Sequence, residues 1–179
     1  MTSASLELAQ ALDAKDDLAP IRALFECPDD TIYMDANSVG PMPTAVREKA
    51  RGLLDDWVHL RRRGWSQRQW LEMPSLLGDC IAPLIGAAPG TVVMSDSTTL
   101  NQFKAVTHAL ALRPDRKVIL TQNGNFPTDV HVLQGIAKAS GGRVTLRFVD
   151  SEDEAIAALD TGVAVVALSH VDYRSGERW

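Results

Sequence analysis

Apolar residues in the first half of the chain recur at intervals of three and four, the spacing of an amphipathic helix. This pattern predicts helices over residues 3–14, 44–60 and 67–85. The third carries Pro74 and Pro83, and proline removes a backbone hydrogen bond from a helix interior. We therefore expect the third helix to be kinked or broken.

From residue 91 onward, short apolar runs of strand length alternate with helical patterns. The predicted strands cover residues 92–94, 117–121, 143–149 and 163–168, and the predicted helices cover 98–112, 128–139 and 151–159. This alternation is typical of an α/β fold with a mostly parallel sheet and flanking helices. We expect a helical entry segment at 1–88 and the first half of a larger domain at 89–179. That domain is expected to be incomplete, because a parallel sheet needs further elements to cover its faces.

The composition is that of an ordinary soluble globular protein. The 179 residues carry 18 Lys and Arg against 23 Asp and Glu, a formal net charge of -5, which gives no electrostatic footprint for nucleic acid. No secretory signal is predicted, and the longest apolar run, Val163 to Leu168, is too short to span a bilayer. A cytoplasmic protein with no membrane or nucleic-acid partner is therefore expected. Cys27 and Cys80 match no metal-binding pattern, so we expect buried free thiols and no metal site.

Ligands of open parallel sheets bind beyond the carboxyl ends of the strands, where three loops of this chain are predicted to lie. In Ser95–Thr99, several hydroxyls meet the free backbone N–H groups of a helix start, which together can hold a phosphate. The alternative is that Ser97 or Thr98 is only the N-cap of that helix.

The second loop, Asn123–Asp129, places an aromatic ring beside a carboxylate. Phe126 could stack on a planar ligand, or it could be a hydrophobic staple with Asp129 stabilised by the helix dipole. The third loop begins at Ser169–His170, where the histidine is either a general base or a structural residue. Taken together, the three loops indicate one planar ligand that carries a phosphate.

Four segments of the chain resemble, in order and with matching spacing, the motifs of one enzyme family. They are IYMDANSVG at 32–40, DSTTLN at 96–101, NFPTD at 125–129 and SHVDYRSG at 169–176. The chain is similar in this way to the kynureninases, pyridoxal-phosphate enzymes of the aspartate-aminotransferase fold (fold type I). The resemblance runs from about residue 12 to the last residue, and the second segment alone would not be specific.

The resemblance implies hydrolysis of L-kynurenine or 3-hydroxykynurenine to L-alanine and anthranilate or 3-hydroxyanthranilate, a step of tryptophan catabolism and NAD biosynthesis. It implies pyridoxal 5'-phosphate as the cofactor and a homodimer as the active form. By position, the residues expected to hold the cofactor are Thr98 and Thr99 at the phosphate, Phe126 on the pyridine ring, and Pro127, Thr128, Asp129 and Ser169. The residues expected to face the substrate are Asn37, Ser38 and Trp65.

The chain departs from the family pattern at Ala36, where the family has Gly, and at Val39, where it has Leu. No lysine matches the family's Schiff-base lysine, which is expected beyond residue 179; the five present are Lys15, Lys49, Lys104, Lys117 and Lys138. The resemblance thus implies an N-terminal fragment of a kynureninase, inactive alone because covalent catalysis needs the missing amine. Two alternatives stay open: another fold type I enzyme, such as a cysteine desulfurase-like protein or an aminotransferase, and a truncated domain without catalytic function.

Overall fold

The computed structural model describes residues 5–28 and 30–179. The chain divides into two units, one up to Pro74 and the other Ser75–Trp179. The domain boundary predicted at residue 88 refers to the domains of a longer protein, and it stays a prediction.

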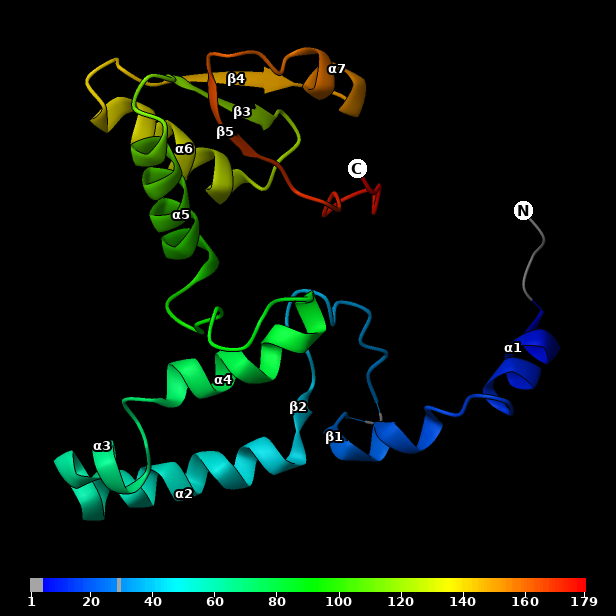
Figure 1. Ribbon diagram of the computed structural model, residues 1–179. Coiled ribbons are helices and arrows are strands. Elements are labelled where there is room, and N and C mark those ends of the chain that lie inside the picture. The colour runs from blue at the N-terminus through cyan, green and yellow to red at the C-terminus, as the bar shows by residue number, and fades with distance from the viewer. Residues whose placement is uncertain (1–4, 29) are drawn as a thin grey trace. The chain divides into compact units, whose positions relative to one another are not determined.

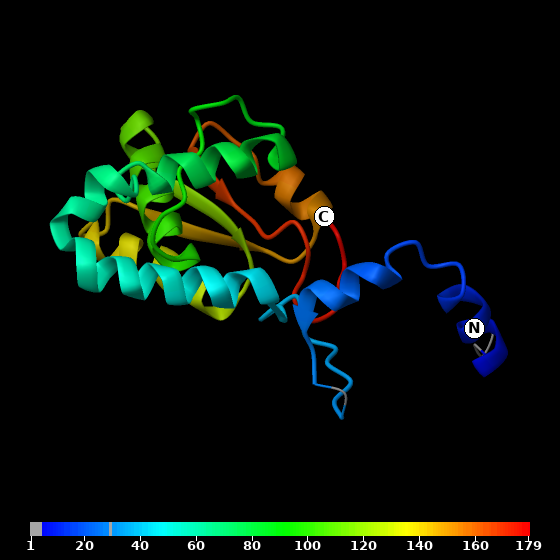
Figure 2. The same cartoon turned by 90° about the horizontal axis from the view of Figure 1, so that it is seen from below.

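The first unit is mostly helical and is built around one long helix. Its elements are α1 (Leu6–Asp13), the 3-10 turn η1 (Ala19–Leu24), β1 (Phe25–Glu26), β2 (Met42–Pro43), α2 (Thr44–Leu60), the 3-10 turn η2 (Arg61–Arg63) and α3 (Gly64–Gln67). Helix α2 has the predicted bounds and is unbroken in Figure 1 and Figure 2. Arg68, just after α3, donates two hydrogen bonds to the carboxylate of Asp56 on α2, at 2.8 and 3.1 Å.

The helix predicted over residues 67–85 is broken, as expected. Residues 68–72 are not helical, and residues 73–85 of the predicted range form α4 (Met73–Ile81) and the 3-10 turn η3 (Ala82–Ile85). Pro74 and Pro83 stand in the first turns of α4 and η3, where the missing N–H has no partner to lose. The prolines therefore begin the pieces and do not kink one helix.

The second unit contains a three-stranded parallel sheet. After η3 its elements are α5 (Thr98–Leu112), β3 (Val118–Gln122), α6 (Pro127–Ala139), β4 (Thr145–Val149), α7 (Glu152–Ala157) and β5 (Val163–Ala167). The strands are arranged in the order β4-β3-β5. The chain leaves β3 through α6 to reach β4, then returns through α7 to pair β5 with the other side of β3 (Figure 1). The predicted α/β class with a mostly parallel sheet is confirmed.

Helices cover both faces of this sheet. Successive side chains of a strand point to opposite faces, so adjacent apolar residues of β3 are buried on different sides of the sheet. Ile119 of β3 is fully buried against α5 and α6, whereas the adjacent Leu120 is fully buried on the face of α7. Trp179 packs on the Leu120 face as well. On β5, which pairs only with β3 among the described strands, Val166 is 48% exposed.

Two expectations for the second unit are wrong. Residues 92–94 form no strand, because a strand exists only where a neighbouring strand completes its hydrogen bonds, and no described strand lies beside them. Cys80 is exposed instead of buried. Gly78 of α4 and Ala82, the first residue of η3, are buried one helical turn apart, and Cys80 lies between them in the sequence, on the opposite side of the helix. No helix in the described part of the chain is long and apolar enough to cross a membrane.

Ser151 is the N-cap of α7, and its hydroxyl belongs to a capping box. Its Oγ accepts a hydrogen bond from the Glu154 N–H at 3.2 Å, while the Glu154 carboxylate accepts the Asp150 N–H at 2.8 Å. Removing an N-cap hydroxyl costs about 1 kcal/mol of stability, so Ser151→Ala should lower the free energy of unfolding by that amount in urea denaturation. Thr161→Ala is the matched control, since Thr161 is exposed and makes no hydrogen bond to the described residues through its side chain; an equal loss there would contradict the prediction.

Candidate functional site

The carboxyl ends of β3 and β5 meet at a buried asparagine. Asn125, three residues after β3, is 7% exposed, and its Oδ1 accepts hydrogen bonds from the Phe126 N–H at 2.8 Å and the Ser169 hydroxyl at 2.6 Å. Its Nδ2 donates to the Thr121 hydroxyl at 3.4 Å. One side chain thereby connects the loop that carries Phe126 with the loop that carries Ser169.

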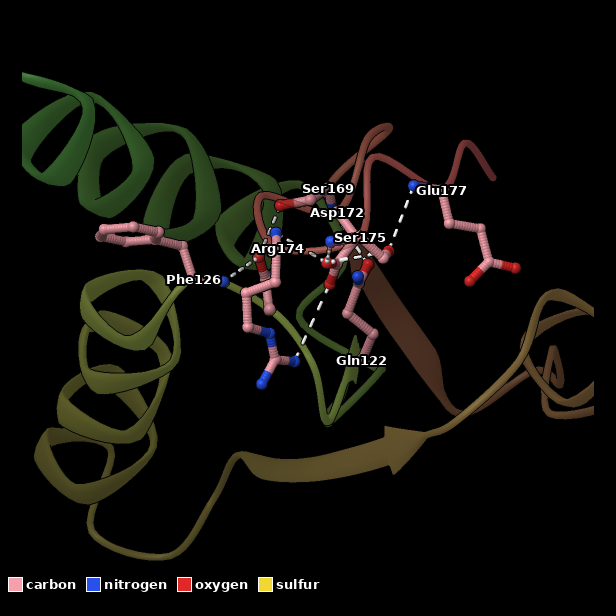
Figure 3. A network of polar contacts seen from close by, with 8 residues as sticks. Gln122, Phe126, Ser169, Asp172, Arg174, Ser175 and Glu177 are labelled. Carbon is pink, nitrogen blue, oxygen red and sulfur yellow. Dashed lines mark hydrogen bonds and ion pairs between the residues drawn. The ribbon is translucent and has the colours of Figure 1, made fainter. Parts of the chain in front are cut away.

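A second buried amide fixes the same junction. Gln122, the last residue of β3, is 2% exposed, and its Oε1 accepts the backbone N–H of Ser169 at 3.0 Å (Figure 3). The Thr121 hydroxyl donates to the Ala167 carbonyl at 2.8 Å, which adds a further link between β3 and β5. We call Thr121, Gln122, Asn125 and Ser169 the strand-end network.

The ring of Phe126 lies beside this network and is available to a ligand. It is 45% exposed, and the ring of Tyr173 meets it edge-on, with 4.9 Å between centroids and 69° between planes. Aromatic pairs prefer this T-shaped geometry. The segment after Ser169 therefore contributes an aromatic neighbour to the predicted stacking residue.

The turn that holds Tyr173 is organised by the carboxylate of Asp172. Its Oδ1 accepts the backbone N–H groups of Ser175 at 2.8 Å and Arg174 at 2.9 Å, and these bonds hold the pKa of Asp172 below its usual value (Figure 3). A polar cleft of about 500 Å³ lies next to this turn, and Gln122, Gly124, Asp172 and Arg174 are among its lining residues.

In the loop before α5, the residue that caps the helix differs from the residues predicted to bind the cofactor. Ser97 is the N-cap, since its Oγ accepts the Leu100 N–H at 3.4 Å. The side chains of Thr98 and Thr99 are exposed and make no hydrogen bonds to the residues that the structure describes. Their hydroxyls and the N-terminal end of a 15-residue helix are therefore available to an anion.

The preceding Asp96 gives this loop its shape. Its φ of 50° lies in the left-handed region, which aspartate tolerates better than most residues. Its carboxylate accepts hydrogen bonds from the Lys104 ammonium and, at 2.9 Å, from the Ser95 hydroxyl, and both bonds lower the pKa of Asp96. Lys104 of α5 is thus engaged in an ion pair with the loop that precedes its helix.

The other residues of the predicted cofactor loop begin α6. Pro127 is its first residue, Thr128 is exposed, and Asp129 is half-buried in the first turn. Burial raises the pKa of the Asp129 carboxyl above its usual value. Pro127 and Asp129 are also residue types that favour the start of a helix. This structural role, given above as the alternative, does not prevent the segment from contacting a ligand.

The three predicted substrate residues lie in the first unit. Asn37 and Ser38 belong to a turn held by Tyr33, whose hydroxyl donates to the Asp35 carbonyl at 3.0 Å. Trp65 of α3 is 47% exposed, with the guanidinium of Arg62 5.7 Å from its ring centroid. Their role toward a substrate stays a prediction, as do the cofactor contacts of the second unit.

The sequence interpretation missed the buried members of the strand-end network. Thr121 and Gln122 were placed in or beside an ordinary strand, and Asn125 appeared only as the first letter of a matching motif. The signal in the sequence is the pair of polar residues that ends an apolar strand. A buried polar side chain requires a hydrogen-bond partner, so this pair indicates a polar contact with a neighbouring segment.

Comparison with known proteins finds kynureninases among the relatives of this chain. The chain is 41% identical over 171 residues to a kynureninase of Pseudomonas fluorescens, covering 93% of this chain and 41% of that protein. It is 38% identical over 175 residues to kynureninases of Burkholderia pseudomallei strain 1106a and Burkholderia mallei strain SAVP1, covering 95% of this chain and 42% of each. No family model matches the chain. Nearly the whole chain is therefore similar to kynureninases, and it spans about two fifths of the length of these curated relatives.

Proposed function

We propose that this chain is part of a kynureninase, which hydrolyses L-kynurenine or its 3-hydroxy form to L-alanine and anthranilate or 3-hydroxyanthranilate. The observation that carries the proposal is the similarity to kynureninases across 93% of the chain. The fold agrees with it, because two of the matching segments follow adjacent parallel strands and are joined through Asn125. Ligands of open α/β sheets bind at this edge.

The residues present fit pyridoxal 5'-phosphate as the cofactor. Thr98 and Thr99 offer free hydroxyls at a helix N-terminus, which suits a phosphate, and Phe126 offers an exposed ring face, which suits a pyridine ring. When bound, the cofactor supplies the electron sink for cleavage of a carbon–carbon bond. In this proposal the chain binds the phosphate, stacks on the ring and orients it.

Further cofactor contacts come from the loops at the ends of β3 and β5. The segment Pro127, Thr128 and Asp129 borders the ring position, and the Ser169 hydroxyl is the group that contacts the cofactor from the end of β5. Asn37, Ser38 and Trp65 are proposed to face the substrate. In this proposal, residues of a longer chain supply the lysine used for covalent catalysis and further strands beside β5, and the active form is a cytoplasmic homodimer.

The proposal is tested with a protein that contains this chain and has the full length of its relatives. Given pyridoxal phosphate and L-kynurenine, it should release anthranilate and alanine in equal amounts, measured by anthranilate fluorescence and amino-acid analysis. The 179-residue chain alone should release neither. Full-length protein that binds pyridoxal phosphate but forms no anthranilate, and instead converts cysteine to alanine with release of sulfur or transfers an amino group, would show that another reaction of the fold is the correct one.

A further inference from the structure

The side-chain amide of Asn125 can adopt only one of its two orientations. The atom that faces the backbone of Phe126 at 2.8 Å must accept a hydrogen bond, because a backbone N–H can only donate. That atom is therefore Oδ1, and a rotation of the amide by 180° would place two donors against each other. The orientation follows from a main-chain group, whose donor character is certain.

The orientation of this amide determines the direction of the Ser169 hydroxyl. Ser169 Oγ lies 2.6 Å from Oδ1 of Asn125, an atom that can only accept, so the serine must donate its proton. On the other side of the amide, Nδ2 donates to the Thr121 hydroxyl, whose own proton goes to the Ala167 carbonyl. The donor and the acceptor of each of these side-chain hydrogen bonds are therefore fixed.

We propose that Asn125 is a positioning residue that keeps the proton of Ser169 directed into the protein, so that Ser169 offers the cofactor lone pairs and no proton. This inference rests on the proposed function, in which Ser169 contacts pyridoxal phosphate. The cofactor group beside Ser169 must then be a hydrogen-bond donor. Gln122 supports the arrangement by accepting the Ser169 backbone N–H at 3.0 Å, which fixes the main chain of this residue.

A double-mutant cycle on the full-length protein tests the inference, with the dissociation constant of pyridoxal phosphate measured from its absorption spectrum. Asn125→Ala and Ser169→Ala should each weaken binding about 10-fold, the effect of one misdirected or lost hydrogen bond. Because Asn125 acts through Ser169, the double variant should also lose about 10-fold, whereas independent residues would lose about 100-fold. Asn123→Ala is the matched control, since Asn123 is exposed and its side chain hydrogen bonds, among the described residues, to Asp150 at 2.8 Å; this variant should bind like the wild type.

Asn125→Asp separates positioning from a purely structural role. A carboxylate oxygen still accepts hydrogen bonds from Ser169 and from the Phe126 N–H, so cofactor affinity should stay within about threefold of wild type. The buried charge should nevertheless lower the thermal midpoint. A structural role alone predicts that affinity falls together with stability, so this variant keeps the inference testable if Asn125→Ala does not fold.

Three outcomes would overturn the inference. Asn125→Ala could bind pyridoxal phosphate as tightly as wild type or more tightly, which would mean that the released Ser169 proton serves the cofactor. The effects of Asn125→Ala and Ser169→Ala could multiply, which would mean that the two residues act independently. Wild-type full-length protein that binds no pyridoxal phosphate would overturn the proposed function as well, whereas the first two outcomes leave that function standing.

Discussion

Replacing Gly78 with alanine is expected to lower the free energy of unfolding by about 3 kcal/mol, the upper end of the usual cost of overpacking. A Cβ at this position would lie 1.9 Å from the carbonyl oxygen of Val92 and 2.5 Å from its carbonyl carbon. Both neighbours are backbone atoms, which cannot rotate away as a flexible side chain can. Helix α4 and the segment that follows it must separate to admit one methyl group.

The same substitution at Gly135 should have the opposite sign and is the control. Gly135 lies inside α6, and a Cβ there meets nothing within 4 Å. Alanine is favoured over glycine in a helix interior by up to about 1 kcal/mol. Urea denaturation of both variants measures the difference. Equal midpoints for Gly78→Ala and the wild type would show that the close approach of α4 to residues 92 and 93 does not exist in solution.

The sequence predicts an element accurately where the interactions that specify it are local, and poorly where they join distant parts of the chain. Helices α2 and α5 have the predicted bounds, because a helix is specified by local spacing and, for α5, by its own N-cap Ser97. The apolar run at 92–94 resembles a strand locally, but a strand depends on a distant partner that local pattern does not reveal. The need for glycine at position 78 is equally non-local, since it comes from backbone 14 residues later in the chain.

The candidate site was predictable where residues carry their own chemistry and hidden where they act through others. The sequence predicts Phe126 and the two threonines as ligand contacts, because an aromatic ring and hydroxyls at a helix start can bind a ligand directly. Gln122 gave no such signal, because its function in the structure depends on the main chain of Ser169, 47 residues away. The pairing of β3 with β5 brings these positions together, and pairing is the property that a single sequence specifies least clearly.

Removing both hydroxyls in Thr98→Ala/Thr99→Ala is expected to weaken pyridoxal phosphate binding by the full-length protein about 100-fold. Each hydroxyl can give a phosphate one charge-assisted hydrogen bond, and two lost bonds at about 1.5 kcal/mol each, the lower end of the usual range, correspond to a factor of this order. The effect on stability should be small, because both side chains are exposed and Ser97 already caps the helix. Ser97→Ala should do the reverse, lowering stability by about 1 kcal/mol with little change in cofactor affinity.

Pyridoxal, which lacks the phosphate, shows whether the two threonines act on that group. Its affinity should be the same for the wild type and for Thr98→Ala/Thr99→Ala, because its ring contacts in the proposed site are made by Phe126 and Ser169. The preference of the wild type for the phosphorylated form should therefore shrink in the variant by about the same 100-fold, since the helix N-terminus alone retains only its backbone N–H groups. An equal loss of affinity for both compounds would place the threonines near the ring, and no loss for either would place the phosphate elsewhere.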